Sequence, residues 1–319
     1  MRIGIDAREL SGQPTGVGRY LAAILREWAG DECATRHEFV LYAPEALAID
    51  LDRRRFVTRL VPGTPGTWWE QVRVPPVAAA DHLDVFFAPA YTAPLRLEAP
   101  TVVTVHDLSY AAHPEWFRLR EGARRRWITR RSVQRAAQVI TVSAFSRDEI
   151  AEHFSLPAGR VRVIVSGIDP PVVTAAAYAE PRVLYVGSIF NRRRVPALIR
   201  AFAALLRRRP DAVLDIVGAN RTHPYEDIAG AIERDGLSGH VRWHQYVSDE
   251  RLRELYSRAR AFAFLSEYEG FGMTPLEALA VGIPPVVLDT PVARETCGDA
   301  AIFVPKDDLP ATTEALEAA

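Results

Sequence analysis

Short apolar runs alternate with amphipathic stretches along the whole chain, and this alternation constrains the fold more than any other feature of the sequence. Strands are predicted at residues 1–6, 102–105, 139–142, 161–165, 183–186, 213–217, 261–265 and 285–288. Helices are predicted between them, at residues 18–28, 118–137, 196–208, 249–259 and 275–280. Strands that alternate with helices form parallel sheets that are covered on both faces. The sequence therefore predicts an α/β fold.

A stretch rich in proline and alanine, residues 166–181, interrupts this rhythm before the strand-turn-helix pattern restarts at Val183. We expect an inter-domain linker there, with an N-terminal domain at residues 1–170 and a C-terminal domain at residues 171–319. Two doubly wound, Rossmann-like domains that face each other across a cleft would bring together the carboxyl ends of their strands. Ligands bind at those ends, so the residues that follow each strand are the candidates for a site.

Composition narrows the possible functions. The charges nearly balance, with 39 basic and 40 acidic residues, which argues against a nucleic-acid partner. Cys33 and Cys297 lie far apart and lack metal-ligand spacing, so neither a disulfide framework nor a zinc site is indicated. The N-terminus lacks the apolar core of a signal peptide, and no apolar run approaches the roughly 20 residues of a membrane span. We expect a cytoplasmic protein that is at most peripheral to a membrane.

The most specific segment follows the predicted strand at residues 261–265. It reads Glu269-Gly270-Phe271-Gly272-Met273-Thr274-Pro275-Leu276-Glu277, and Pro275 is expected to open a helix. Free backbone N–H groups at a helix start, with glycines that permit close approach, suit a diphosphate. Thr274 and Glu277 also have the spacing of a capping box, which alone would explain Glu277. A capping box explains neither Glu269 nor the Gly-Phe-Gly sequence.

This segment resembles the spaced glutamate pair of the retaining glycosyltransferase family 4, a GT-B group that includes many bacterial mannosyl- and glucosyltransferases. Four other segments resemble the same family in the same order, and the resemblance covers nearly the whole chain. They are Gly16-Val17-Gly18-Arg19-Tyr20, Thr104-Val105-His106-Asp107-Leu108, Val142-Ser143-Ala144-Phe145-Ser146, and Leu184-Tyr185-Val186-Gly187-Ser188 with Arg192-Arg193. The resemblance implies the GT-B fold and transfer of a hexose, of mannose or glucose type, from a GDP- or UDP-sugar. The implied acceptor is a glycan or a lipid-linked molecule.

The resemblance also implies roles for particular residues. His106 would contact the donor sugar, Glu269 the transferred sugar or the reacting centre, and Arg193 the diphosphate in place of the family's usual lysine. These three are the predicted catalytic residues. Donor binding is predicted for Gly16, Gly18, Gly187, Ser188, Arg192, Arg193, Gly270, Phe271, Gly272, Met273 and Glu277. Ser188 departs from the family, which usually has an arginine there, and either Arg192 or Arg194 could compensate for it.

Structural explanations stay open for several of these residues. Gly16 and Gly18 fit a tight turn as well as a close approach to phosphate or acceptor. Ser143 and Ser146 have an ordinary explanation as helix N-caps. The Trp68-Trp69-Glu70-Gln71 sequence fits helix packing as well as stacking on a sugar.

No Asp-x-Asp metal site follows a predicted strand, and Arg193 with the helix start could stabilise a leaving diphosphate without a metal or another cofactor. If the stereochemistry of the family holds, transfer retains the anomeric configuration of the donor. Members of the family usually continue through further helices, so we expect the C-terminal domain to lack its last helices. We then expect donor binding to exceed turnover.

The predicted helix at residues 118–137 places arginines near one face. Arg120, Arg124, Arg131 and Arg135 share this face with Trp127. The face could meet an anionic membrane or a lipid-phosphate acceptor, or it could be solvated.

Rival functions share the predicted architecture. A sugar-nucleotide epimerase would consume the donor without an acceptor, and a glycosyl phosphorylase would need a cofactor-binding lysine, for which Lys306 is poorly placed. A non-catalytic sugar-nucleotide-binding protein would tolerate the loss of His106. A nicotinamide oxidoreductase is disfavoured because the GxGxxG fingerprint is missing.

Overall fold

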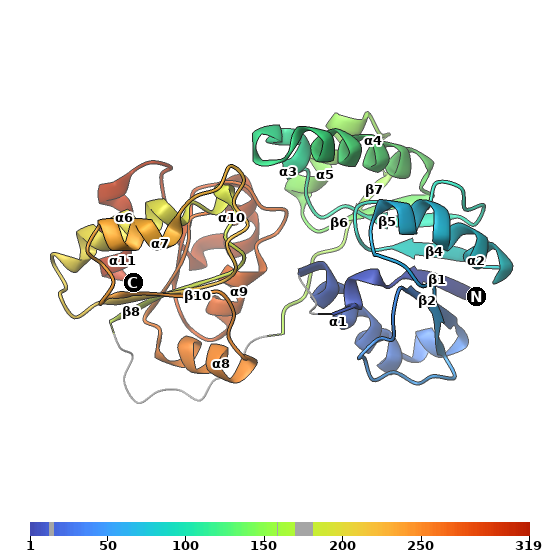
Figure 1. Ribbon diagram of the computed structural model, residues 1–319, viewed down its shortest axis with the longest axis horizontal. Coiled ribbons are helices and arrows are strands. Elements are labelled where there is room, and N and C mark those ends of the chain that lie inside the picture. Colours follow the sequence, from blue (N-terminus) through green and yellow to red (C-terminus); the bar gives the residue numbers. More distant parts are fainter. Residues whose placement is uncertain (13–15, 158, 170–180) are drawn as a thin grey trace. The chain divides into compact units, whose positions relative to one another are not determined.

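The computed structural model describes residues 1–12, 16–157, 159–169 and 181–319. Contacts divide the chain into two compact units, of which the first comprises Met1–Leu108 and Arg120–Val165. The second comprises Ser109–Leu119 and Ser166–Ala319. Each unit is a parallel sheet with helices on both faces, which confirms the predicted α/β fold (Figure 1).

The division differs from the expected one at one short segment. Ser109–Leu119 was predicted in the N-terminal domain but packs with the second unit, where the imidazole of His113 lies edge-on to the Tyr268 ring at 5.3 Å. The predicted linker at 166–181 and boundary at 170/171 fall largely outside the described residues.

The first unit contains a seven-stranded parallel sheet among its described residues, in the order β3-β2-β1-β4-β5-β6-β7. Its strands are β1 (Arg2–Asp6), β2 (Glu38–Ala43), β3 (Phe56–Leu60), β4 (Val85–Ala88), β5 (Thr101–Thr104), β6 (Gln138–Thr141) and β7 (Val161–Val163). Its helices are α1 (Gly16–Gly30), α2 (Val74–Ala80), α4 (Leu119–Arg135) and α5 (Ala144–Phe154), with short turns η1 (Arg8–Leu10), η2 (Glu32–Arg36) and η3 (Trp69–Arg73).

The second unit repeats the same winding. Its described residues form a six-stranded parallel sheet in the order β10-β9-β8-β11-β12-β13. The strands are β8 (Arg182–Val186), β9 (Val213–Val217), β10 (Val241–His244), β11 (Ala261–Phe264), β12 (Pro285–Leu288) and β13 (Ile302–Val304). The helices are α3 (Ser109–Ala112), α6 (Val195–Leu206), α7 (Ile228–Arg234), α8 (Asp249–Arg258), α9 (Met273–Ala280), α10 (Pro291–Cys297) and α11 (Leu309–Ala318), with turns η4 (Pro114–Trp116), η5 (Asn191–Arg193) and η6 (Gly298–Ala300).

The central strands are buried on both faces, which is why they are apolar throughout. Every residue of β11 and β12 is buried, and helices such as α6 contribute one apolar face to the same core. Removing this apolar surface from water is the main force that holds each unit together. No helix within the described ranges is long and apolar enough to cross a membrane.

The strand order reverses at one place in each sheet. In the first unit the reversal lies between β1 and β4, and in the second it lies between β8 and β11. Doubly wound sheets bind ligands at the carboxyl ends of the strands that flank this reversal. The loops after β8 and β11 carry the segments that the sequence singles out.

Candidate functional site

Arg193 and Glu269 meet at the strand reversal of the second sheet. Arg193 ends η5, after β8, and its Nε donates a hydrogen bond of 2.8 Å to Glu269 Oε1, in the loop after β11. Arg193 Nη2 lies 3.4 Å from Oε2, and Ser266 Oγ donates to Oε1 at 2.9 Å. The side chains of Arg193 and Glu269 are only 15% and 13% exposed. Two of the three predicted catalytic residues therefore form a largely buried, bidentate ion pair.

The electrostatics of this pair keep Glu269 ionised. Burial opposes ionisation, but the charges of Arg193 and Arg192, with hydrogen bonds from Arg193 and Ser266, outweigh it and lower the pKa of Glu269 below its ordinary value. Burial raises the pKa of the nearby Tyr185 to about 12, so this phenol stays neutral. The site therefore holds a fixed carboxylate and fixed guanidinium groups at neutral pH.

Two glycines make room for the guanidinium of Arg193. Gly187 has a φ of +145°, and a Cβ added to it would lie 2.6 Å from Arg193 Nη1. Gly218, after β9, has a φ of +152°, and its Cβ would lie 2.0 Å from the carbonyl oxygen of Gly187. Arg193 Nη1 donates instead to the backbone carbonyl of Ser188 at 2.9 Å. Ser188 thus holds Arg193 through its backbone carbonyl, and Gly187 leaves the space that the guanidinium occupies.

The helix after Glu269 begins earlier than the sequence predicts. Gly272, with a φ of +86°, precedes α9, so Met273 is its first residue and Pro275 its third. The expectations of Pro275 at the first position and of a Thr274–Glu277 capping box are therefore wrong. The left-handed turn at Gly272 lets the chain enter the helix two residues sooner. Glu277 is buried in the second turn and accepts a hydrogen bond from Tyr256 Oη at 3.4 Å.

Several hydrogen-bond donors around this loop lack a protein partner. Within the described part of the chain, the backbone N–H groups of Phe271, Gly272 and Met273 donate no hydrogen bond. Arg192 Nε and Thr274 Oγ1 are buried and also have no hydrogen-bond partner among the described residues. Buried donors are rarely left unsatisfied, and donors at a helix start favour negatively charged oxygens. The loop is suited to bind an anion.

Arg192 and Arg194 differ in their surroundings. Arg192 Nε lies 3.8 Å from Glu269 Oε1, and its Nη1 lies 3.4 Å from Ser109 Oγ. Arg194 turns away from this carboxylate and pairs with Glu267 at 3.3 Å and with Asp307. Arg192, and not Arg194, supplements the positive charge of Arg193.

His106 lies in the first unit, just after β5. Its Nε2 donates to the carbonyl oxygen of Pro89 at 2.8 Å, and because a carbonyl can only accept, the neutral ring carries its proton on Nε2. Burial lowers the pKa of His106 below its ordinary value, against the opposing effects of the Pro89 hydrogen bond and the charge of Asp107. Asp107 accepts a hydrogen bond from Tyr91 Oη at 3.1 Å. His106 is therefore neutral at pH 7.

The predicted N-terminal glycine loop lies in the same unit as His106. Gly16 opens α1 and Gly18 is buried in it, while residues 13–15 lie outside the described residues. Tyr20, one turn along α1, stands edge-on to the His106 ring, with the ring centroids 4.9 Å apart. The start of α1 and His106 are thus neighbours.

The two serines that were predicted as helix caps occupy different positions relative to α5. Ser143 caps α5, because its Oγ accepts from the backbone N–H of Ser146 at 3.0 Å. Ser146 lies inside the helix, so its cap assignment is wrong, and its Oγ donates to the His106 carbonyl at 3.4 Å.

Sequence reasoning assigned no role to Ser266, Tyr185 or Pro89. Ser266 holds Glu269, and its position three residues earlier in the same loop was a usable signal. Pro89 acts through a backbone carbonyl, for which a side-chain pattern carries no signal. Among the residues that the structure describes, no group of three or more His, Cys, Asp or Glu side chains could hold a metal ion.

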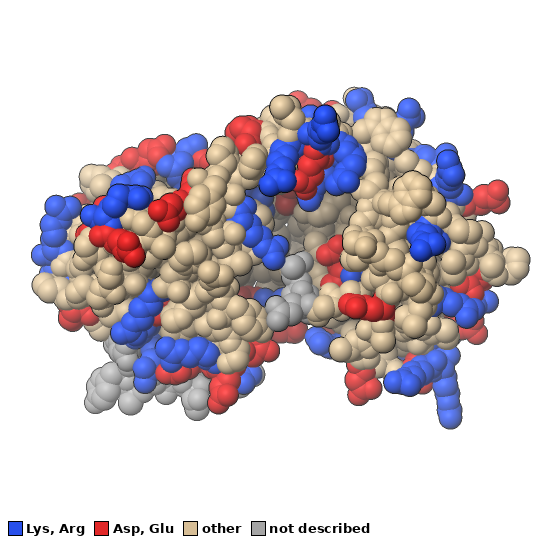
Figure 2. Space-filling view, in the orientation of Figure 1, with Lys and Arg blue, Asp and Glu red and all other residues tan. Residues whose placement is uncertain are grey.

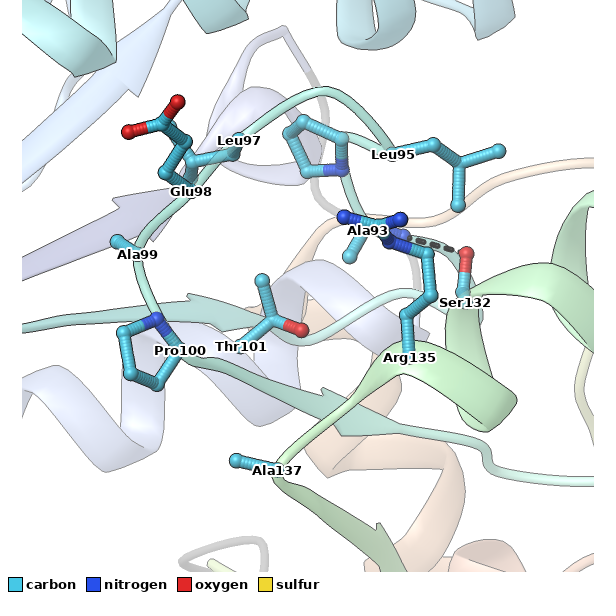
Figure 3. Close-up of a pocket in the computed structure, with 11 residues that line it drawn as sticks. Ala93, Leu95, Leu97, Glu98, Ala99, Pro100, Thr101, Ser132, Arg135 and Ala137 are labelled. Carbon is cyan, nitrogen blue, oxygen red and sulfur yellow. Dashed lines mark hydrogen bonds between the residues drawn. The ribbon is translucent and has the colours of Figure 1, made fainter.

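A pocket in the first unit lies away from these residues (Figure 3). Thr101 opens β5 and Ala137 precedes β6, so the pocket is at the amino ends of these strands. Figure 3 shows Arg135 extending over the pocket from the end of α4, where Ala93 N–H donates to Ser132 Oγ at 3.0 Å. Ligands of doubly wound sheets bind at the opposite, carboxyl ends, so we assign this pocket no part in the site.

Two family models match the chain over consecutive ranges. The model described as Glycosyltransferase Family 4 matches residues 14–172, and the model described as Glycosyl transferases group 1 matches residues 173–318. The chain belongs to the family 4 glycosyltransferases. The family implied by the ordered motifs is therefore confirmed.

Curated relatives of this family 4 glycosyltransferase include bacterial mannosyltransferases. O-antigen chain mannosyltransferase B of Escherichia coli is 30% identical over 247 residues, which are 73% of this chain and 65% of that protein. A GDP-mannose:cellobiosyl-diphosphopolyprenol alpha-mannosyltransferase of Xanthomonas oryzae pv. oryzae is 28% identical over 239 residues, 72% of this chain and 60% of that protein. The chain thus spans less than two thirds of the length of these relatives.

Solved structures show the same fold as this family 4 glycosyltransferase. Sucrose-phosphate synthase from Thermosynechococcus elongatus matches with a TM-score of 0.76 at 18% identity, over 100% of this chain and 89% of that one. WaaG, a glycosyltransferase involved in lipopolysaccharide biosynthesis, matches with a TM-score of 0.73 at 17% identity, over 100% and 90% of the two chains. The GT-B fold expected from the sequence is confirmed.

Proposed function

We propose that the chain transfers a hexose, of mannose or glucose type, from a GDP- or UDP-sugar to a glycan or lipid-linked acceptor. The observation that carries the proposal is the set of unpartnered donors at the start of α9, beside the ion pair of Arg193 and Glu269. A nucleoside diphosphate presents the anionic oxygens that such donors satisfy. The proposed protein is an enzyme whose donor site lies in the second unit.

The relatives favour mannose as the transferred sugar. The two curated relatives described above are mannosyltransferases, and the name of the Xanthomonas protein specifies GDP-mannose and a lipid-linked diphosphate acceptor. The solved structure of Anabaena HepE, a complex with UDP-glucose, matches with a TM-score of 0.75 and keeps a glucosyl donor open as the second choice. None of these relatives is named as an epimerase, a phosphorylase or a sugar-nucleotide sensor.

The proposed reaction breaks the bond between the anomeric carbon and the diphosphate. Negative charge then develops on the leaving diphosphate, where Arg192, Arg193 and the N–H groups of the Phe271–Met273 loop can stabilise it without rearrangement. The acceptor oxygen attacks the anomeric carbon from the same face, and the departing phosphate takes the acceptor proton, so the anomeric configuration is retained. Glu269 and neutral His106 would hold sugar hydroxyls. The proposed reaction requires no metal and no further cofactor.

Two glycine variants test the donor site. Gly272→Ala should weaken the binding of GDP-mannose or UDP-glucose by about tenfold or more, because an alanine at φ +86° shifts the N–H groups that precede α9. Binding is measured by the concentration dependence of the melting temperature across a panel of GDP- and UDP-sugars, and transfer by release of the nucleoside diphosphate.

Gly282→Ala is the matched control, because Gly282 also has a left-handed φ, of +80°, and its added Cβ also meets nothing within 4 Å. Both variants carry a similar backbone strain of about 1 kcal/mol and should melt at similar temperatures without ligand. Only Gly272→Ala should lose affinity. Equal affinities in the two variants, or no binding of any nucleotide sugar to the wild type, would refute the proposed donor site.

A peripheral contact with anionic membrane, on the cytoplasmic side, is a further part of the proposal. Helix α4 buries one face and exposes Arg120, Arg124, Trp127, Arg131 and Arg135 on the other. Trp127 is 57% exposed, and the guanidinium carbon of Arg131 lies 5.9 Å from the centroid of its ring. Basic side chains gather along the upper edge of Figure 2, where Figure 1 labels α4. Basic residues around an exposed tryptophan are typical of helices that bind anionic lipid surfaces.

A flotation assay tests this contact. Wild-type protein should float with vesicles that contain anionic lipid at low salt, and Arg124→Glu/Arg131→Glu should weaken vesicle binding by at least tenfold, since each charge near the surface contributes about 1 kcal/mol. Arg208→Glu/Arg209→Glu, which reverses two exposed arginines of the second unit, is the charge-matched control. Equal flotation of the two double variants would eliminate α4 as the contact.

A further inference from the structure

Buried charges occupy the strand reversal of the first sheet. Asp6 ends β1 and is 1% exposed, and Glu70 is also 1% exposed. Arg8 lies between them, with Nη2 at 2.9 Å from Glu70 Oε1 and Nε at 3.4 Å from Asp6 Oδ2. Burial raises the pKa of Asp6 to about 6, although Arg8 opposes the shift. Isolating two carboxylates and one guanidinium from water is costly, so such a cluster indicates a requirement beyond packing.

Glu70 reaches this cluster from an uncommon turn. Trp69–Arg73 forms a π-helical turn, a geometry that is frequent at functional sites. Trp69 anchors the turn in the core through Nε1, which donates to the Val61 carbonyl at 2.6 Å, whereas Trp68 is 72% exposed. Gln71 donates to Glu70 Oε2 at 2.8 Å and to the Ala93 carbonyl at 2.9 Å. Glu70 and Gln71 therefore both contact the segment that follows β4.

This segment joins the charged cluster to His106. Thr92 Oγ1 donates to Glu70 Oε1 at 2.7 Å, the same oxygen that Arg8 contacts. Three residues earlier, the carbonyl of Pro89 accepts the Nε2–H of His106 at 2.8 Å. Between them, Tyr91 has a φ of +67°, and its ring centroid is 5.5 Å from that of His106. The four consecutive residues 89–92 thus contact the charged cluster through Thr92 and the imidazole of His106 through Pro89.

We propose that Glu70, held by Arg8 and acting through Thr92, is a positioning residue that fixes the tautomer and orientation of His106. The ion pair anchors Thr92, the anchored segment keeps the Pro89 carbonyl within reach of Nε2, and this bond holds the proton on Nε2 so that Nδ1 remains an acceptor. The expected effect of this positioning on sugar transfer rests on the proposed function. The expected effect on the tautomer of His106 does not depend on that function.

The test removes the Thr92 hydroxyl, which donates to Glu70 at 2.7 Å and accepts a longer hydrogen bond from Arg8 Nη2 at 3.5 Å. Thr92→Val deletes the hydroxyl that donates to Glu70 while keeping the shape of the side chain, and Thr92→Ser retains the hydroxyl. The fraction of His106 with its proton on Nε2 is measured by NMR of the intact chain labelled with ¹⁵N-histidine, with the resonance assigned from His106→Gln. Thr92→Val should lower this fraction and reduce kcat by about tenfold, with KM for the donor within about twofold of wild type. Thr92→Ser should restore both.

Tyr42→Phe is the control, because it tests whether the loss of any buried hydrogen bond in this unit has the same effect. It removes the bond of 2.8 Å from Tyr42 Oη to Asp81 Oδ2 in the same unit and should leave the His106 tautomer unchanged. An unchanged tautomer in Thr92→Val, or equal changes in Thr92→Val, Thr92→Ser and Tyr42→Phe, would overturn the inference. A tautomer shift confined to Thr92→Val, in a protein that transfers no sugar, would support the positioning role and refute the proposed function.

Discussion

Replacing Arg193 by methionine is expected to destabilise the chain by about 3 kcal/mol, because it leaves the ionised Glu269 buried without its bidentate partner. Urea denaturation measures this loss. The double variant Arg193→Met/Glu269→Gln should recover at least half of it, since the uncompensated charge is then absent. The ionised form of Glu269, whose folded pKa is lowered, contributes stability above the ordinary pKa of 4.5, and this contribution is lost as the pH falls through the folded pKa. The difference between wild type and Arg193→Met should shrink accordingly.

The chain offers a closely matched exposed pair as the control. Arg294 contacts Asp289 through Nε at 2.8 Å and Nη2 at 2.9 Å and lies over the ring of Phe303, as Arg193 lies over that of Phe264. Its side chain is 51% exposed, so Arg294→Met should cost about 1 kcal/mol or less. If the two methionine variants lose equal stability, burial is not what makes the Arg193 pair strong.

The second large effect is expected on turnover. Glu269→Gln should lower kcat about 10²–10³-fold while donor affinity changes much less, because the amide keeps the size of the side chain but removes the fixed charge at the proposed reacting centre. Release of the nucleoside diphosphate from the preferred donor, with and without acceptor, gives both quantities.

Glu267→Gln is the control from the same loop. Glu267 is 16% exposed and pairs with Arg194 and Lys306, whereas Glu269 pairs with Arg193 and Arg192. Its replacement should change kcat by no more than about threefold. A Glu269→Gln variant that retained the turnover of Glu267→Gln would remove Glu269 from the proposed mechanism.

The strands that the sequence predicts best are those buried on both faces. β8, β9 and β12 have nearly unbroken apolar runs, and their observed bounds lie within one residue of the predicted ones. β3 and β10 were not predicted, because solvent-facing residues interrupt their apolar pattern, as Arg242 does in β10. β2, β4 and β13 were also missed, although the run from Phe39 to Ala43 in β2 is buried throughout and was predictable.

The sequence predicts which residues belong to the candidate site, but it does not predict which of them contact one another. Arg193 and Glu269 are 76 residues apart, and nothing in either segment specifies that they pair. The start of α9 depends on the left-handed Gly272, and a glycine allows that conformation without requiring it. The link from Glu70 to His106 depends on a backbone carbonyl and on a π-helical turn, neither of which has a residue pattern of its own.

The contact between Gly218 and Gly187 limits how donor preference can be re-engineered. A side chain at Gly218 would displace the Gly187 carbonyl, and the displaced strand end would push on Arg193. In a mutant library that randomises every residue around Arg193, most members with a side chain at Gly187 or Gly218 would therefore misplace the guanidinium of Arg193. These members would be lost from the library. Variation in donor choice is more accessible through side chains that border the loop without supporting Arg193.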